Sequence, residues 1–204
     1  RLPEDQPAGT YWYHPHRHNS VAIQAWGAMA GLLIVKGKFD EELAGHGVAR
    51  DFPFVVHDPH TRIERYPKGA VSGIAKVGRF LDNQNNSVDV TFLVTGRYRP
   101  TFTIKRNEIV RFRHLTATVE NLSGFRIVKK KDGDPKTVSR ASPESENKPF
   151  YIVASDGIAY EKPVRQSFMV CAGGERHDLL LQIDEPGDYY VLSDKLDHIQ
   201  FFGT

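Results

Sequence analysis

Three histidines, His14, His16 and His18, alternate with other residues near the beginning of the chain. They follow a run of aromatic and β-branched residues, which predicts an extended strand from Thr10 to His18. Alternate side chains of a strand share one face, so the three imidazoles would point the same way, about 7 Å apart. Imidazole is the commonest protein ligand of copper, zinc and iron. The spacing therefore predicts a metal site at His14 and His16, and a polar strand face that meets solvent is the alternative.

The residues around these histidines resemble a known copper motif. Residues 9–16 read Gly-Thr-Tyr-Trp-Tyr-His-Pro-His, and an apolar segment follows at residues 27–35. This combination resembles the second copper motif of multicopper oxidases, a family built from cupredoxin β-sandwiches. The resemblance implies that His14 and His16 are ligands of the paired type-3 coppers. His18 matches an extra histidine of one variant of the motif and is expected to support the ligands without binding copper, whereas Asn19 stands where that variant often has Gly.

Most of the remaining chain resembles the second domain of three-domain members of the same family. The matching segments are residues 50–58, 92–96, 100–104, 108–115, 154–157, 174–181 and 186–190. The resemblance implies that residues 1–49 are the last strands of a first cupredoxin domain with a linker at 37–47. Residues 50–204 would then be a second, copper-free domain. Because the family's other copper motifs would precede Arg1 and follow Thr204, we expect the chain to be a piece of a longer oxidase.

Hydrophobic periodicity predicts an all-β fold. Val88, Val90, Phe92 and Val94 alternate with Asp89, Thr91, Leu93 and Thr95. Later in the chain, Val110, Phe112 and His114 alternate with Ile109, Arg111, Arg113 and Leu115. Further strands are expected at 150–155, 165–170, 179–183 and 189–193, with a long loop at 129–148. The pattern predicts an antiparallel sandwich. With the resemblance, we expect a cupredoxin-like Greek-key β-sandwich, with one near-complete domain and the terminal strands of a preceding one.

Composition excludes several classes of function. The net charge of +2 is too small to indicate nucleic-acid binding, and no apolar run approaches the length of a membrane span. A single cysteine, Cys171, excludes an internal disulfide and a cysteine-based zinc site. A type-1 copper centre in the resembled family uses a His-Cys-His segment, whereas Cys171 lies between Val170 and Ala172, so we expect a buried thiol. The chain opens without a signal peptide, which indicates a mature or trimmed form.

The resemblance implies a periplasmic or extracellular oxidoreductase as the parent protein. It would take electrons from a small reducing substrate (a phenol, an amine or a metal ion) at a type-1 copper absent from this chain. It would reduce dioxygen to water at a trinuclear copper cluster shared with the remaining cupredoxin domains. One alternative is a non-catalytic cupredoxin-like copper-binding or structural module. The other is a zinc or iron site that uses His57, His60 and an acidic residue. His114 is interpreted as a satisfied core or interface histidine rather than a metal ligand, and His46 as exposed.

Overall fold

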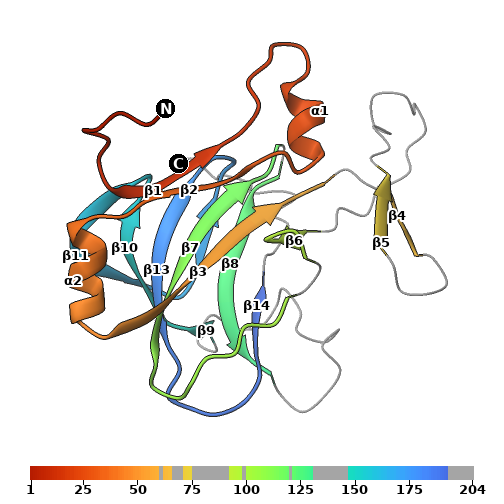
Figure 1. The fold of residues 1–204 in the computed structure, drawn as a ribbon. Helices are drawn as coiled ribbons and strands as arrows, with labels where there is room; N and C mark the ends of the chain where they lie inside the picture. The colour runs from red at the N-terminus through yellow and green to blue at the C-terminus, as the bar shows by residue number, and fades with distance from the viewer. Residues whose placement is uncertain are drawn as a thin grey trace, which may run out of the picture.

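The protein folds as a β-sandwich, seen here in a computed structural model that describes residues 1–59, 62–65, 71–74, 92–97, 100–119, 121–130 and 147–192 (Figure 1). For residues 62–65 and 71–74 only the backbone is described. One layer is a six-stranded sheet in the order β11-β10-β13-β7-β3-β6. Its strands are β3 (Val48–His57), β6 (Leu93–Val94), β7 (Ile109–Ala117), β10 (Phe150–Ser155), β11 (Ile158–Gln166) and β13 (Arg176–Gln182).

The second layer is a four-stranded sheet in the order β12-β8-β14, with β9 also paired to β8. Its strands are β8 (Ser123–Lys129), β9 (Asn147–Lys148), β12 (Met169–Cys171) and β14 (Tyr189–Leu192). Two further pairs are separate from both layers, β1 (Gly9–Tyr13) with β2 (Gly31–Val35) and β4 (Arg62–Arg65) with β5 (Val71–Ile74). The two helices of the described residues are α1 (Val21–Trp26) and α2 (Lys38–Gly45).

The main core lies between the two layers and follows the predicted alternation. Strand β7 places Val110 and Phe112 on the inner face, where they meet Phe125 of β8 and Phe150 and Leu179 of the same sheet. All five are at most 2% exposed. Aromatic rings in this core meet mostly edge to face, the arrangement that their quadrupoles favour.

The other face of the six-stranded sheet is covered by the β1–β2 pair and by α2, which begins near the end of β2 (Figure 1). Trp12, Ala30 and Leu32 pack on a second buried cluster, which consists of Val55, Leu115 and Ala117. Because both faces of β7 are covered, eight of its nine residues are buried.

Several details of the predicted strands differ from the observed ones. The strand expected at residues 10–18 ends at Tyr13, so the histidines lie beyond it. The expected linker at 37–47 contains α2, whose first turn is closed by a hydrogen bond from the Gly37 N–H to Asp40 Oδ2 at 2.8 Å. The strand expected at 165–170 is two strands, β11 and β12. The pair β3–β7 is parallel, whereas every other strand pair among the described residues is antiparallel.

Two expectations concern residues that the structure describes only in part. Of the strand expected at 88–94, β6 is described and residues 88–91 lie outside the described residues. Most of the loop expected at 129–148 lies outside them as well. No helix in the described residues is long and apolar enough to cross a bilayer.

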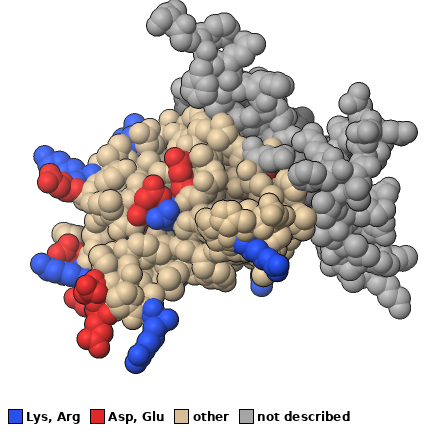
Figure 2. All heavy atoms as spheres, turned by 90° about the horizontal axis from the view of Figure 1, so that it is seen from above, with Lys and Arg blue, Asp and Glu red and all other residues tan. Residues whose placement is uncertain are grey.

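The charges on the face that Figure 2 shows are mixed in sign. Positive and negative side chains are interspersed there, and a wide area between them carries neither. This distribution agrees with the low net charge of +2, and neither indicates a surface built for a polyanion.

Candidate metal centre

Strand β1 determines where the three N-terminal histidines begin. Its register with β2 runs from Gly9 opposite Val35 to Tyr13 opposite Gly31. Trp12 points toward the sandwich, where its ring packs against the second buried cluster. The apolar residues of β1 and β2 thus anchor the strand, and the segment with the three histidines continues from its fixed end.

Beyond the strand, four rings of alternate residues follow one another in a column, which we call the histidine column (Trp12, His14, His16 and His18). The Trp12 and His14 rings are stacked, with centroids 4.1 Å apart and planes 17° apart. The His14 and His16 centroids are 5.8 Å apart, and those of His16 and His18 are 5.7 Å apart. The prediction that the three imidazoles gather on one side of the chain is confirmed, although no strand holds them there.

The three imidazoles of the column are exposed, and one of them has a defined hydrogen bond. Nδ1 of His14 lies 2.9 Å from the carbonyl oxygen of Pro15, so that nitrogen carries the proton and donates it. The remaining nitrogen, Nε2, then has a free lone pair, which is the state in which imidazole binds a metal. With its plane fixed by Trp12 and its tautomer fixed by Pro15, His14 is prepared to act as a ligand.

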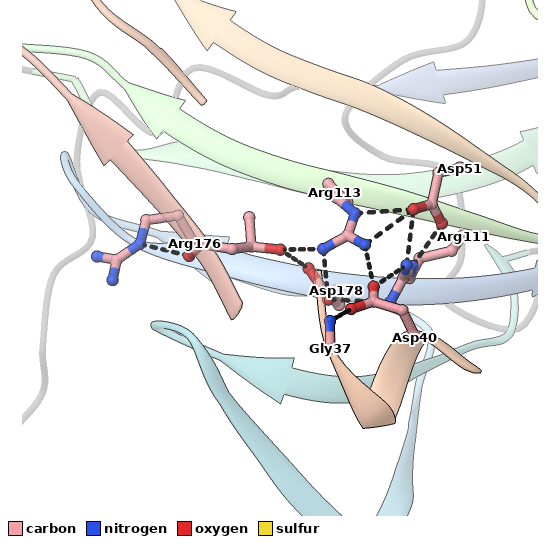
Figure 3. Close-up of polar contacts among 8 residues, drawn as sticks. Gly37, Asp40, Asp51, Arg111, Arg113, Arg176 and Asp178 are labelled. Carbon is pink, nitrogen blue, oxygen red and sulfur yellow. Dashed lines mark hydrogen bonds and ion pairs between the residues drawn. The ribbon is translucent and has the colours of Figure 1, made fainter. Parts of the chain in front are cut away.

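A buried charge network fixes β1 against the sandwich (Figure 3). Thr10 Oγ1 donates to Asp178 Oδ1 of β13 at 2.6 Å and accepts from Arg113 Nη1 of β7 at 2.8 Å. Thr10, Asp178 and Arg113 are all buried. One hydroxyl group therefore ties the strand that precedes the histidines to two strands of the six-stranded sheet.

The same network reaches α2 and β3 through two arginines of β7. Arg111 donates to Asp51 through Nε at 2.5 Å and to Asp40 through Nη2 at 2.6 Å. Arg113 contacts the same two carboxylates, and its Nη2 lies 2.9 Å from Asp51 Oδ2. Asp178 completes the network at 3.6 to 3.7 Å from both guanidinium groups. The network thus joins β3, β7, β13, α2 and β1.

The pKa values of two carboxylates in this network, Asp40 and Asp178, are shifted in opposite directions. Burial alone would raise the pKa of Asp40, but the Gly37 N–H and the guanidinium groups of Arg111 and Arg113 lower that pKa to about 2. Burial raises the pKa of Asp178 above its ordinary value, and the Thr10 hydroxyl and the two guanidinium groups offset this only in part. Asp40 is therefore a firm negative charge, whereas Asp178 binds a proton more readily than a solvated aspartate.

The remaining histidines separate into exposed and buried ones. His46 follows α2 and is exposed, as predicted. His57 ends β3 as a buried residue whose Nε2 lies 3.3 Å from the Ala30 carbonyl oxygen, and burial lowers its pKa. His60, the other histidine of the alternative zinc or iron site, lies outside the described residues.

His114 differs from its prediction in one respect. It is fully buried in the core, as expected, with its ring between Phe54 and Phe125. The prediction of a satisfied histidine is wrong, since neither ring nitrogen has a hydrogen-bond partner among the described residues. Burial, and then the nearby His177, lower its pKa to about 3, so the ring is neutral.

Sequence reasoning missed one group of metal-binding side chains. Cys171, Glu175 and His177 place their ligand atoms within 4.8 Å of one another. Cys171 is buried, as predicted, but it has an imidazole and a carboxylate as neighbours. The signal in the sequence was the Gly-Gly pair at residues 173–174, which predicts a turn that returns the chain past the cysteine.

Comparisons with known proteins give two kinds of relative. No family model matches the chain. The chain is 26% identical over 192 residues to the cell division protein FtsP of Yersinia pestis, covering 93% of this chain and 35% of that protein. Among solved structures, the McoA multicopper oxidase of Aquifex aeolicus superposes with a TM-score of 0.62 at 20% identity, over 87% of this chain and 34% of that one. The laccase-like multicopper oxidase CueO of Ochrobactrum sp. gives 0.58 at 25% identity, over 91% and 39%.

These comparisons define the fold as a cupredoxin-like β-sandwich, which confirms the predicted fold class. Its structural neighbours are multicopper oxidases, whereas its sequence relatives carry the name of a cell division protein. The chain spans about a third of the length of the FtsP sequences that it matches, 35% in the Yersinia pestis protein.

Proposed function

We propose that this chain is part of a protein of the multicopper oxidase type and that His14 and His16 are copper ligands in it. The observation that carries the proposal is the ring geometry at the end of β1. His14 is stacked on Trp12 and donates Nδ1–H to the Pro15 carbonyl, and His16 is its neighbour at 5.8 Å between ring centroids. Such orientation of an imidazole by a backbone carbonyl is typical of metal-binding histidines.

The residues of the site fit copper. Imidazole suits copper, and two rings on one segment can each serve one ion of a pair about 3.5–4 Å apart. We propose that His18, at the end of the histidine column, supports His16 through its ring and does not bind copper itself. A bound copper cluster would supply the one-electron steps that couple oxidation of a small reducing substrate to reduction of dioxygen to water.

We propose further that residues 1–49 are the terminal strands of one cupredoxin domain and that residues 50–204 form the next. The histidine column is exposed, and so are Tyr13 and Met29 near the ends of β1 and β2, at 61% and 57%. A neighbouring cupredoxin domain that brings further histidines would cover these residues and complete the site. On this proposal the working partners are that domain, dioxygen and a phenol, amine or metal-ion substrate, in the periplasm or outside the cell.

The test is copper binding by the intact gene product. We expect the copper-loaded protein to show the near-ultraviolet absorption of a coupled copper pair, and His14→Ala and His16→Ala each to abolish it. His46→Ala, an exposed histidine outside the column, is the matched control and should retain the band. Retention of the full band and copper content in the double variant His14→Ala/His16→Ala would refute the assignment.

A second candidate is a copper-free structural module of a cell division protein. The match to FtsP of Yersinia pestis over 93% of this chain favours it, and the buried charge network gives such a module rigidity without any metal. The same experiment separates the two candidates. An intact protein that binds no copper, with the histidine variants unchanged in their cellular role, supports the structural module.

A further inference from the structure

A second group of side chains of the types that bind metals shares no residue with the histidine column, although Gly174 in its turn approaches Trp12. The thiol of Cys171, a carboxylate oxygen of Glu175 and a ring nitrogen of His177 lie within 4.8 Å of one another. Within the described part of the chain this is the only set of three histidine, cysteine or acidic side chains that gathers so closely. Nothing in the proposed copper function uses it.

The fold builds this group from both layers. Cys171 ends β12 in the four-stranded sheet, and His177 lies in β13 of the six-stranded sheet. The connecting turn uses Gly174 at φ +91°, a conformation that glycine adopts without strain. Glu175 closes the turn, since its Oε2 accepts the Ala172 N–H at 2.8 Å. The turn also bonds to the backbone of β7, so its geometry is fixed from two sides.

Hydrogen bonds orient the His177 ring toward the other two residues. Nδ1 of His177 lies 2.8 Å from Ser155 Oγ, and the Tyr160 hydroxyl donates to that same oxygen at 2.7 Å. Nε2 is then the nitrogen that faces the group, 3.9 Å from Glu175 Oε2. In the tautomer that donates Nδ1–H to Ser155, Nε2 has a free lone pair, and a metal-bound histidine is commonly held this way.

His114 gives an independent indication that a ligand belongs here. It lies directly opposite His177 in the β7–β13 pairing, and the two ring centroids are 6.3 Å apart. Its side chain is completely buried and neither ring nitrogen has a partner. Buried polar groups almost always have a hydrogen bond, because leaving one unpaired is costly. His114 is thus a buried imidazole beside His177 that has no hydrogen-bond partner among the described residues, and a bound ion that reached one of its nitrogens would give it one.

We propose that Cys171, Glu175 and His177 form a site for a borderline-soft divalent cation, with Zn²⁺ as the chemistry that fits best. Thiolate, imidazole and carboxylate are the three side-chain types that bind zinc. The cysteine is buried, while the side chains of His177 and Glu175 are 16% and 42% exposed. An ion could therefore enter past Glu175, and a water molecule on that open side would complete four ligands.

Binding must be accompanied by loss of one proton. Burial, and then the charge of Glu175, raise the pKa of the Cys171 thiol to about 12, so the metal-free group holds a protonated sulfur. Burial lowers the pKa of His177, so its ring is neutral. When Zn²⁺ forms its bond to sulfur, the S–H bond breaks and the proton passes to solvent. Affinity should therefore rise with pH.

The test uses the chain with His14, His16 and His18 all replaced by alanine, so that the histidine column cannot bind the metal. Zn²⁺ is titrated into this variant, and the loaded protein is measured by X-ray absorption at the zinc edge. We expect one bound Zn²⁺ with a sulfur neighbour at about 2.3 Å. A spectrum with only nitrogen and oxygen neighbours, or no binding in the triple variant, overturns the proposal. Because the column is absent, failure of the copper assignment does not affect this result.

Single substitutions in that background assign the ligands. Cys171→Ser should remove the sulfur signal, and His177→Gln should weaken binding strongly. Ser155→Ala should weaken binding about 10- to 100-fold through loss of ring orientation. His46→Ala is the matched control and should bind as the parent does. Circular dichroism confirms that each variant is folded, and an indicator dye measures whether one proton is released per Zn²⁺. Equal zinc affinity in folded Cys171→Ser and in the parent would also overturn the proposal.

Discussion

Two sets of polar side chains adjoin strand β1, and the protein holds them in opposite ways. The charge network at Thr10 has four buried members, Thr10, Arg111, Arg113 and Asp178, and two partly exposed carboxylates, and it draws them from five elements. The histidine column begins only two residues further on, and its imidazoles are exposed and, within the described part of the chain, in ring contact only with one another and with Trp12. Burial makes the first set expensive to disturb, whereas the second set keeps free nitrogen atoms.

The charge network thus serves stability, whereas the histidine column, a few residues further along the chain, is suited to binding. A ligand site needs donor atoms that the protein itself has not already satisfied, and the network has few of these. The column instead gains its order from β1, which the network holds in place through Thr10. The network therefore positions the column without entering its chemistry, and four predictions test this division of roles.

The largest expected effect is on the network. Arg113→Met should lower the free energy of unfolding by about 3–5 kcal/mol, because it removes a buried guanidinium group from the buried carboxylate of Asp178 and from the partly exposed carboxylates of Asp40 and Asp51. Urea denaturation measures the loss. Arg50→Met removes an arginine from a more exposed ion pair with Glu108 and serves as the control, for which we expect a much smaller change. Equal losses would mean that burial does not distinguish the network.

The second largest effect is expected from acid, which should lower the stability that the network provides. The pKa of Asp40 is lowered from 3.8 to about 2 in the folded protein, so its contribution to stability is complete above about pH 4 and is lost as the pH falls toward 2. The raised pKa of Asp178 acts in the opposite sense, since protonation of that group favours the folded state. As the pH is lowered from about 4 to 2, the urea midpoint of the parent should therefore fall steeply, and that of Asp40→Asn should fall less steeply.

Glu41→Gln is the control for that measurement, because Glu41 is exposed on the same helix. It should leave the steep fall unchanged. If Asp40→Asn shows the same pH dependence as the parent, the Asp40 carboxylate does not carry the acid sensitivity of the network.

The attachment of β1 can be weakened by a single methyl group. A Cβ at Gly9 would lie 2.6 Å from the Gly157 carbonyl oxygen, a backbone atom that cannot move aside cheaply. Gly9→Ala should therefore cost about 1–3 kcal/mol, as overpacking usually does. Gly31→Ala is the matched control, because its Cβ would meet only the ring end of Tyr13, which is 61% exposed and can swing away. Comparable losses for both would contradict the close approach at Gly9.

The smallest effect on stability is expected in the histidine column. Replacing His16 or His18 by alanine should change the free energy of unfolding by about 0.5 kcal/mol or less, since both are exposed. His14→Ala should cost slightly more because its ring stacks on Trp12. Thermal unfolding measures all three. A large loss at His16 would mean that the column supports the fold and would blur the contrast with the network.

The parts of the fold that local patterns determine were predictable from the sequence. Strand β10 was predicted with its observed bounds, and the inward positions of β7 followed from their period of two. Most of β11, residues 158–164, was missed because it is an exposed edge strand containing Pro163, with no apolar alternation to indicate it. The parallel pairing of β3 with β7 was also missed, because strand direction depends on contacts between residues about 60 positions apart.

The charge network could not be predicted from the sequence for the same reason. Arg111 and Arg113 alternate with apolar residues, which is the pattern of a solvent-facing strand, and only α2 and the β1–β2 pair make that face buried. Their partner Asp40 is 71 residues from Arg111. The His14 and His16 pair needed no such distant information, because all the residues that orient it lie within the same short segment.

Trp12 gives the molecule an internal optical probe. Its indole stacks on the His14 ring and also approaches Gly174, where an added Cβ would lie 3.1 Å from the indole. The chain has one other tryptophan, Trp26, which is buried in α1. The fluorescence of Trp12 should consequently be quenched when a paramagnetic ion binds to His14, and its emission wavelength should shift when the turn at Gly174 tightens. One fluorophore can therefore report on both contacts.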